Sequence, residues 1–359
     1  MKVTIVAGAR PNFIKIAPLI REIKKRPEAG IQFRLVHTGQ HYDQKLSQIF
    51  FEELEIPHPD INLAVGSGTQ AEQTGRIMIE FEKELMSHST DMVIVVGDVT
   101  STMACAIVAK KLQVKLAHIE AGIRSFDYTM PEEVNRVVTD ALADYFFTTS
   151  SFANENLVKS GVDNSRIFFV GNIMIDTLVW AREKLRKPID FDRIPLIKQN
   201  YFVITLHRPS NVDDVLKMEK IFEAIETGIG SSNAVFPVHP RTAKMLQQSS
   251  WKSSKIILVE PMSYLEFIYL IENAAGVITD SGGVQEETTV LNVPCITLRA
   301  NTERPETITD GTNELIGDNL LKLGEALNKI KSGTSKKGKV PDLWDGKTAE
   351  RIIKILADL

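Results

Sequence analysis

Short, almost wholly apolar segments recur along the first half of the chain, with longer helix-like segments between most of them. These segments are VTIVAG from Val3, FRLVH from Phe33, MVIVVGD from Met92, VKLAHIE from Val114, YFFTT from Tyr145 and IFFVG from Ile167. Strands that are buried on both faces of a parallel sheet form continuous apolar runs, and the helices between them cover those faces. The first half therefore predicts a doubly wound α/β domain.

The same pattern restarts after a polar, proline-broken stretch at residues 181–200. Its apolar segments are FVITLH from Phe202, AVFPVH from Ala234, KIILVE from Lys255, GVITD from Gly276 and PCITLR from Pro294. We therefore predict a second domain of the same class, with the boundary near or just before residue 181. Ligands of such sheets bind beyond the carboxyl ends of the strands, so we expect a cleft between the two domains.

Composition narrows the class of protein. The 359 residues include 43% hydrophobic and 25% charged residues, with a formal net charge of -4. These values are those of a globular protein without a global attraction to nucleic acid or an anionic membrane, so we predict neither partner. The start MKVTIVAGAR becomes polar too soon for a signal peptide, and Cys105 and Cys295 lie in apolar stretches. We predict a cytoplasmic protein with two buried thiols.

The sequence offers no motif for a metal or a redox cofactor. The segment AHIEAG contains the His-x-Glu of zinc deaminases, but Pro294-Cys295 lacks the second cysteine of their zinc site. The first strand is followed by GARPNF rather than GxGxxG, which argues against a nicotinamide or flavin enzyme. We predict no metal and no cofactor.

Charged residues follow the strands of the first half. After the first strand, Arg10 and Lys15 flank a helix start, where two cations suit a phosphate or are simply solvated. Asp98 and Glu120 end two further strands, although Asp98 also suits a helix cap. Glu132 stands in the first turn of a helix, with Arg136 and Asp140 at i+4 and i+8. That face is either solvated or functional.

In the second half the strand ends suggest a nucleotide site. His207 and His239 end successive strands, and Ser281-Gly282-Gly283 connects a strand to a helix. Unpaired N–H groups at a glycine-rich helix start can hold a phosphate, assisted by the cation of Arg304. Glu286 or Glu287 could accept from ribose hydroxyls. The alternatives are core histidines and an ordinary tight turn.

Taken together, the residues indicate a nucleotide held by the second domain and a sugar processed by carboxylates of the first. At this point the order GARPNFIKIAPL, GDVTST, HIEAGIRS, MPEEVNR, LHRP, PVHPRT and ITDSGGVQEE, followed by TERPE, resembles the non-hydrolysing UDP-N-acetylglucosamine 2-epimerases nearly end to end. The resemblance implies a GT-B-like fold of two Rossmann-like domains, residues 1–172 and 173–345, with a C-terminal helix at 346–359 that packs back on the first. It also implies a homodimer.

The family interconverts UDP-N-acetylglucosamine and UDP-N-acetylmannosamine through elimination and re-addition of UDP. The resemblance implies acid-base roles for Asp98, Glu120 and Glu132, and a catalytic role for His207. It places a UDP-sugar against the remaining candidates, which are Arg10, Lys15, Arg136, His239, Phe267, Ser281, Gly282, Gly283, Glu287 and Arg304. Phe267 is expected near the uracil, and Lys15 beside the carboxylates.

Two departures from the family pattern leave the sugar specificity and an allosteric UDP-sugar site open. Many relatives have GTRPE at the first turn, where this chain has Ala9 and Asn12, and HRxEN where it has HRPSN. The alternatives are an epimerase of a related UDP-diacetamido sugar, a hydrolysing 2-epimerase that releases UDP, a glycosyltransferase, and a nucleotide-sugar sensor without catalysis. A glycosyltransferase needs an acceptor, and the carboxylates suit epimerisation better.

Overall fold

The computed structural model describes residues 1–40, 50–188, 191, 196–238, 240–248 and 251–359. The chain divides into two compact units. Unit 1 comprises Met1–Trp180 and Asp342–Leu359, and unit 2 comprises Ala181–Pro341. The boundary after Trp180 falls inside the helix Ile173–Arg182, which the bounds implied by the family resemblance, but not the polar stretch at residues 181–200, assign wholly to the second domain.

The described strands of unit 1 are β1 (Lys2–Ala7), β2 (Gln32–His37), β3 (Ile61–Asn62), β4 (Met92–Val96), β5 (Lys115–Ile119), β6 (Tyr145–Thr148) and β7 (Ile167–Phe169). Its helices are α1 (Arg10–Lys25), α3 (Gln70–Ser87), α4 (Thr100–Lys111), α5 (Pro131–Leu142), α6 (Ser151–Lys159), α7 (Ile173–Arg182) and α15 (Thr348–Asp358), with short 3-10 turns at Pro27–Ala29 and Asn164–Arg166.

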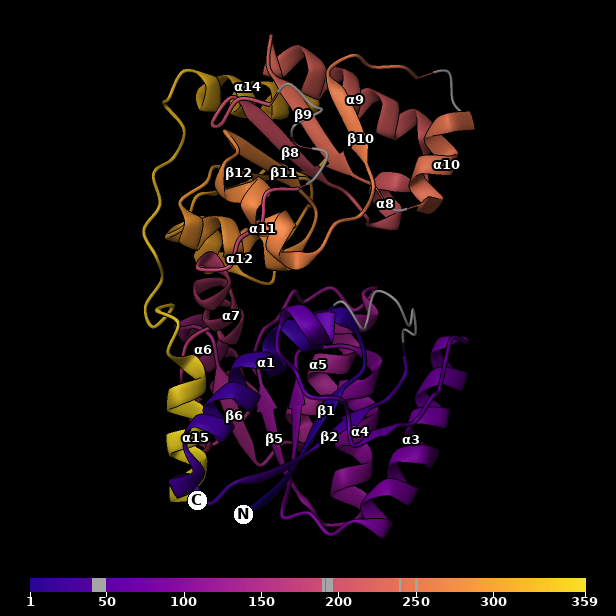
Figure 1. Cartoon of the computed structure of the whole chain (residues 1–359), viewed down its shortest axis with the longest axis vertical. Coiled ribbons are helices and arrows are strands. Elements are labelled where there is room, and N and C mark those ends of the chain that lie inside the picture. Colours follow the sequence, from indigo (N-terminus) through magenta and orange to yellow (C-terminus); the bar gives the residue numbers. More distant parts are fainter. Residues whose placement is uncertain (41–49, 189–190, 192–195, 239, 249–250) are drawn as a thin grey trace. The chain divides into compact units, whose positions relative to one another are not determined.

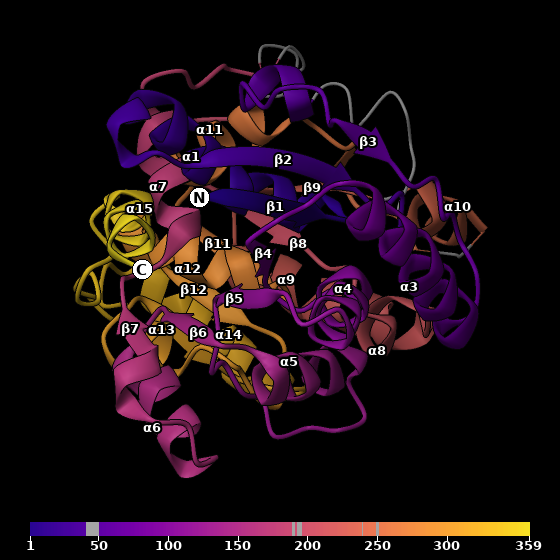
Figure 2. The same cartoon turned by 90° about the horizontal axis from the view of Figure 1, so that it is seen from below.

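The strands of unit 1 form one parallel sheet in the order β3-β2-β1-β4-β5-β6-β7. Figure 2 shows α1, α7 and α15 on one face of this sheet and α3, α4 and α5 on the other. On the second face, Phe81 of α3 and Ala104 of α4 pack in one apolar cluster with Val93 and Val95 of β4. The order of strands reverses between β1 and β4, which is where such sheets bind ligands.

Unit 2 repeats this plan. Its strands are β8 (Tyr201–Thr205), β9 (Asn233–Pro237), β10 (Ile256–Val259), β11 (Gly276–Thr279), β12 (Cys295–Thr297) and β13 (Asn313–Leu315). They pair in parallel in the order β10-β9-β8-β11-β12-β13. The helices are α8 (Pro209–Val212), α9 (Val215–Ile229), α10 (Pro240–Gln248), α11 (Tyr264–Glu272), α12 (Gly282–Leu291), α13 (Pro305–Thr309) and α14 (Leu320–Lys331).

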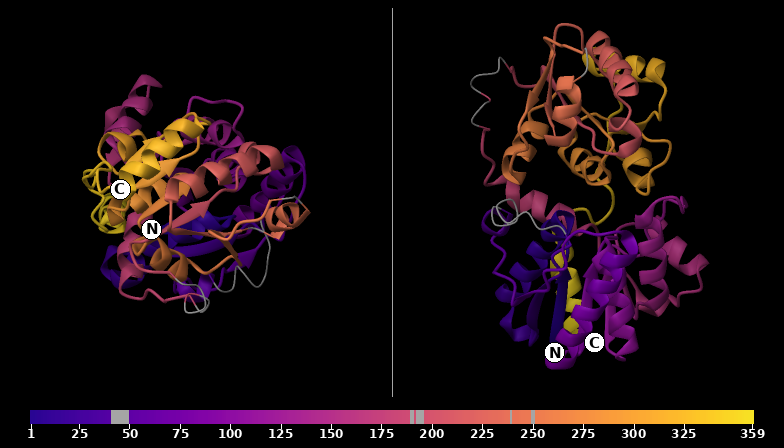
Figure 3. Two further views of the ribbon diagram at one scale, coloured as in Figure 1. Left: turned by 90° about the horizontal axis from the view of Figure 1, so that it is seen from above. Right: turned by 90° about the vertical axis from the view of Figure 1, so that its right-hand side faces the viewer.

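Two apolar clusters sandwich the sheet of unit 2. Met218 and Phe222 of α9 pack with Leu327 of α14 on one face, and Ile271 of α11 packs with Val284 of α12 on the other. Figures 1 and 3 show the helices that carry these residues. The order of strands reverses between β8 and β11, so each unit has a switch point at the centre of its sheet.

The last segment of the chain belongs to unit 1. Helix α15, yellow in Figure 1, lies beside α1, and the carboxylate of Asp176 in α7 accepts from the backbone N–H groups of Thr348 and Ala349 at its start. Trp344 is buried and donates its indole N–H to the carbonyl of Thr149 at 3.0 Å. Unit 1 is therefore completed by residues that follow unit 2 in the chain.

The predicted fold class, α/β with two Rossmann-like doubly wound domains, is confirmed. Among the described residues, no helix combines the length and the apolar character needed to cross a membrane.

Candidate functional site

At the carboxyl edge of the sheet in unit 1, Lys15 of α1 forms an ion pair with Glu120, the residue after β5. Both side chains are buried, with exposed fractions of 5% and 2%. Glu120 has a left-handed backbone (φ 68°), which costs a non-glycine residue on the order of 1–3 kcal/mol. Gly97 makes room for the pair, because a Cβ there would lie 2.8 Å from the Lys15 ammonium.

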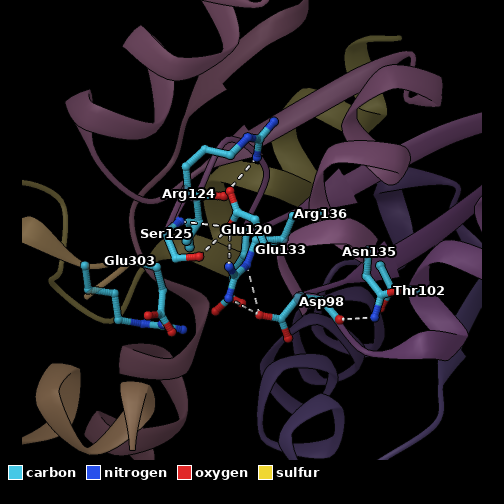
Figure 4. A network of polar contacts seen from close by, with 12 residues as sticks. Asp98, Thr102, Glu120, Arg124, Ser125, Glu133, Asn135, Arg136 and Glu303 are labelled. Carbon is cyan, nitrogen blue, oxygen red and sulfur yellow. Dashed lines mark hydrogen bonds and ion pairs between the residues drawn. The ribbon is translucent and has the colours of Figure 1, made fainter. Parts of the chain in front are cut away.

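Directly after Gly97, Asp98 is gripped by Arg136 of α5. The Nε and Nη2 atoms of Arg136 lie 3.0 and 2.6 Å from Oδ2 of Asp98, whose side chain is 23% exposed. The third donor of the same guanidinium, Nη1, lies 2.8 Å from the buried carboxylate of Glu133. Figure 4 shows Arg136 between these two carboxylates. The amide of Asn135 donates to the Asp98 carbonyl at 2.8 Å.

The acidic residue that shares the buried face of α5 differs from the one predicted. Arg136 and Asp140 are buried together with Glu133, whereas Glu132 is exposed. The buried charged residues therefore have i, i+3, i+7 spacing rather than i, i+4, i+8, and Glu133 faces the loop before the helix, where Ser125 and Phe126 donate to it. The alternative role of Asp98 as a helix cap is wrong, since α4 begins after Val99 without a side-chain cap.

Behind Asp98, a buried histidine connects β5 to α5. His118 Nδ1 lies 2.7 Å from Asp140, and its Nε2 lies 2.9 Å from the carbonyl oxygen of Gly97. Asp140 also accepts from Arg124 at 2.6 Å and from the N–H of Gly122 at 3.0 Å. Burial opposes ionisation, but His118 and Arg124 outweigh it and hold the pKa of Asp140 below its usual value. This network fixes the turn that presents Asp98.

The first turn explains one departure from the family pattern. The Asn12 side chain accepts from the N–H groups of Gly8 and Ala9 at 3.0 and 3.1 Å and donates to the Val96 carbonyl at 3.0 Å. It thus ties the end of β1 to the end of β4. Arg10 is the first residue of α1, and its side chain lies outside the described part of the structure.

In unit 2, Asp280 at the end of β11 organises the neighbouring strand end. His207 Nδ1 lies 2.7 Å from the Asp280 carboxylate, which also accepts from the backbone N–H groups of His207 and Arg208 and from the amide of Asn211. Burial opposes ionisation, but these donors, His207 foremost, hold the pKa of Asp280 below its usual value. The His207 side chain itself remains 61% exposed.

The glycine pair starts a helix, as predicted. Ser281 is the N-cap residue of α12, and its side chain caps no N–H group. The guanidinium of Arg304 lies beside Gly282, because a Cβ on that glycine would meet Nη1 at 2.6 Å. Arg304 is also ion-paired with Glu286 at 2.7 Å and with Glu303 at 2.6 Å. A cation is thus held next to the first N–H groups of α12.

Three further residues were predicted to contact the nucleotide, and the structure describes two of them. Glu287 is buried in α12, and burial, reinforced by Glu286, raises its pKa to about 8 against the opposing effect of the Tyr264 hydroxyl. Phe267 of α11 is partly buried against the apolar cluster under that helix. His239 lies outside the described residues.

Among the predicted site residues, the structure pairs Lys15 with Glu120 and Asp98 with Arg136. It also shows residues that the sequence analysis did not select, namely Glu133, Asp280, Glu303, Asn12 and His118. Their common signal is position within two residues of a strand end or one turn from a selected residue. None could be distinguished by type from solvated surface residues.

Comparison with known proteins identifies the family. The family model for UDP-N-acetylglucosamine 2-epimerase matches residues 21–357. The chain belongs to the UDP-N-acetylglucosamine 2-epimerase family. A relative of that name from Methanocaldococcus jannaschii is 44% identical over 99% of each chain. A crystal structure of the enzyme from that organism in complex with UDP-GlcNAc and UDP superposes with a TM-score of 0.88 at 43% identity over 100% of each chain.

Another similar protein is named for a different UDP-sugar. The UDP-2,3-diacetamido-2,3-dideoxy-D-glucuronate 2-epimerase of Pseudomonas aeruginosa is 39% identical over 88% of each chain. UDP-N-acetylglucosamine 2-epimerases are isomerases, and the fold of this chain is GT-B-like, as expected.

Proposed function

We propose that this protein interconverts UDP-N-acetylglucosamine and UDP-N-acetylmannosamine. The observation that carries the proposal is 44% identity, over 99% of both chains, to an enzyme named for this substrate. The ion-paired carboxylates at the edge of unit 1 and the glycine-rich helix start of unit 2 support it, because they offer a proton acceptor and a phosphate site respectively.

In the proposed reaction a carboxylate removes the proton from C2 of the sugar. The electron pair of the C2–H bond becomes the C1=C2 double bond of a 2-acetamidoglucal, and the C1–O bond breaks with its electron pair on UDP. Re-addition of UDP to C1 and return of a proton to the other face of C2 gives the epimer. Glu120 and Glu132 are the other proposed acid-base residues, with His207 near the diphosphate.

We assign the proton abstraction to Asp98. Its side chain is partly exposed and is oriented through two hydrogen bonds from Arg136, whereas Glu120 is buried against Lys15. A positioned and accessible carboxylate can contribute about 10²–10⁴-fold to the rate of proton transfer.

We assign the nucleotide to the carboxyl edge of unit 2. The N–H groups of Gly282 and Gly283, the hydroxyl of Ser281 and the guanidinium of Arg304 would stabilise the negative charge on departing UDP. Further contacts are proposed from Arg10, His239, Phe267 and Glu287.

Proton NMR in D2O tests the function. With UDP-N-acetylglucosamine we expect loss of the C2 hydrogen signal, appearance of UDP-N-acetylmannosamine and little free UDP. Free N-acetylmannosamine with stoichiometric UDP would instead identify a hydrolysing enzyme. Binding of the UDP-sugar without any spectral change of the sugar would identify a sensor.

A second candidate substrate is a UDP-diacetamido-hexuronate, which the 39% identical relative favours. The same spectra with that sugar distinguish the two, since the true substrate exchanges its C2 hydrogen faster at equal concentration.

The homodimer and the cytoplasmic location are further parts of this proposal. Helix α3 exposes Ile79 and Met86, two turns apart on one side, with exposed fractions of 56% and 74%. We propose this side of α3 as the interface with a second copy. Light scattering after size exclusion tests the dimer, and an Ile79→Glu, Met86→Glu variant should be monomeric.

The proposed cytoplasmic location is supported by the two cysteines, which are both free and buried and suit a reducing compartment.

A further inference from the structure

Glu133 is a buried acid for which neither the sequence pattern nor the family resemblance provided a role. Its side chain is fully buried, yet four donors surround the carboxylate. Oε2 accepts from the N–H and the hydroxyl of Ser125 at 2.8 and 2.9 Å and from Arg136 at 2.8 Å, and Oε1 accepts from the N–H of Phe126 at 3.1 Å. These four donors, one of them the charged guanidinium of Arg136, compensate the burial of the carboxylate.

Glu133 and Asp98 both accept hydrogen bonds from the guanidinium of Arg136. Nη1 of Arg136 faces Glu133, while Nε and Nη2 face Asp98. Because the guanidinium is planar and rigid, fixing Nη1 also fixes the direction of the other two donors. The three side chains form a row of negative, positive and negative charge, in which Glu133 offsets part of the positive potential that Arg136 exerts on Asp98.

We propose that Glu133 is a positioning residue. It orients the guanidinium of Arg136 toward Asp98, and its negative charge reduces the extent to which Arg136 makes the Asp98 carboxyl group more acidic. This inference rests on the proposed function, since it assumes that Asp98 accepts the proton from C2. Without the negative charge of Glu133, the positive potential of Arg136 at Asp98 is larger, and the Asp98 carboxylate becomes a poorer base.

Other charged groups also face this region. The Lys15–Glu120 pair contacts the Gly97 position from α1 and from the end of β5, and the cluster of Arg124, Asp140 and His118 lies behind it on β5, α5 and the following loop. A substitution at Glu133 leaves all of these groups in place. A change in the behaviour of Asp98 can therefore be attributed to the Glu133 charge.

The test is the pH dependence of C2 hydrogen exchange in Glu133→Gln. We expect the acid limb of the rate profile to move down by about one pH unit, because removing the Glu133 charge leaves more positive potential at Asp98 and so favours its ionised form. The plateau rate should fall as well. Ser125→Ala is the matched control: it removes one donor to Glu133 without changing charge, and its acid limb should stay in place.

A purely structural role for Glu133 would lower the plateau and the thermal stability but leave the acid limb where it is, and that result overturns the proposal. If Glu133→Gln does not fold, Glu133→Asp replaces it. The shorter carboxylate withdraws from Arg136, so a smaller shift in the same direction is expected, and its absence is equally fatal.

A titration without substrate separates this proposal from the proposed function. The ¹³C signal of the Asp98 carboxyl, assigned from its loss in Asp98→Asn, should titrate at lower pH in Glu133→Gln than in the wild type. A shift of this signal in an enzyme that does not epimerise would uphold the charge balance and reject the function. An unmoved signal would reject the role of Glu133 whatever the enzyme's activity.

Discussion

The two units have the same sheet order around a central switch point but carry opposite chemistry at their carboxyl edges. In unit 1 the edge consists of carboxylates held by cations from flanking helices, as in Asp98 with Arg136 and Glu120 with Lys15. In unit 2 it consists of the N–H groups that open α12, with Arg304 beside them. The comparison teaches that the sheet provides the place and the strand-end residues provide the function.

The electrostatic contrast extends into the interior. In unit 1, His118 and Arg124 keep the pKa of buried Asp140 low. In unit 2 the donors around Asp280 likewise hold its pKa below the usual value. The pKa of Glu287, in contrast, is raised by burial to about 8. Unit 2 therefore contains a carboxyl group that keeps its proton at neutral pH.

The largest effect should come from removing the proposed base of unit 1. In Asp98→Asn, C2 hydrogen exchange should fall by about 10²–10⁴-fold, because the amide cannot accept the proton. Deuterium incorporation followed by NMR measures this. UDP affinity, measured by calorimetry, should remain within a few-fold of the wild type if chemistry and binding are separated between the units. Normal exchange in the variant would end the assignment of Asp98.

In unit 2, Gly283→Leu should weaken the binding of UDP. A bulky side chain at the start of α12 would keep a phosphate from the N–H groups, and the loss of charge-assisted hydrogen bonds should weaken UDP binding by roughly 10²-fold. Gly324→Leu is the control, since a Cβ at this α14 position meets nothing within 4 Å. Equal UDP affinity in both variants, by calorimetry, would remove the phosphate from this helix.

The buried acid of unit 2 should show itself in the pH dependence of stability. The pKa of Glu287 in the folded protein, about 8, lies above the ordinary 4.5. Its contribution to stability is therefore complete below about pH 4.5 and is lost as the pH rises through about 8. Relative to Glu287→Gln, the wild type should lose on the order of 1.4 kcal/mol per pH unit between these limits.

Urea unfolding of unit 2 at several pH values measures this difference. Glu325→Gln, which changes an exposed carboxylate of the same unit, serves as the control and should run parallel to the wild type. Parallel curves for Glu287→Gln and the wild type would mean that Glu287 is ionised in the folded state.

The smallest expected effect concerns backbone strain at the edge of unit 1. Phe126, 72% exposed in the loop that Glu133 holds, has a left-handed backbone (φ 57°). Phe126→Gly should raise the free energy of unfolding by up to about 1 kcal/mol, because glycine adopts this conformation without a steric penalty. Tyr128→Gly, in the same loop, should not. Thermal unfolding compares the two, and equal effects would show that the strain at Phe126 is negligible.

The fold could be predicted from the sequence because strands buried on both faces need continuous apolar runs, and these runs end at chemically informative residues. The glycine-rich start of α12 was predicted for the same reason, since Ser281 to Gly283 directly follow such a run. The pairing of Asp98 with Arg136 could not be predicted, because the two residues lie 38 positions apart and their contact depends on the orientation of α5.

The sequence pattern did not single out the acid that α5 buries. Glu132 and Glu133 are adjacent, and a shift of one residue rotates a helical side chain by about 100°. In the structure the loop before α5 donates to Glu133, and Glu132 stays exposed. His118 and Asp280 could not be selected either, since part of their hydrogen bonding is to backbone groups that any residue type supplies, and their side-chain partners Asp140 and His207 lie 22 and 73 residues away.

The return of α15 to unit 1 sets the order in which the protein can mature during synthesis. Unit 1 is started by the first 180 residues but lacks the helix that Asp176 caps and the indole of Trp344 until residues 342–359 have left the ribosome. Unit 2 is continuous in the chain and can close first. The nascent chain therefore leaves the surface of unit 1 that α15 covers open throughout translation of unit 2, and residues 342–359 close it.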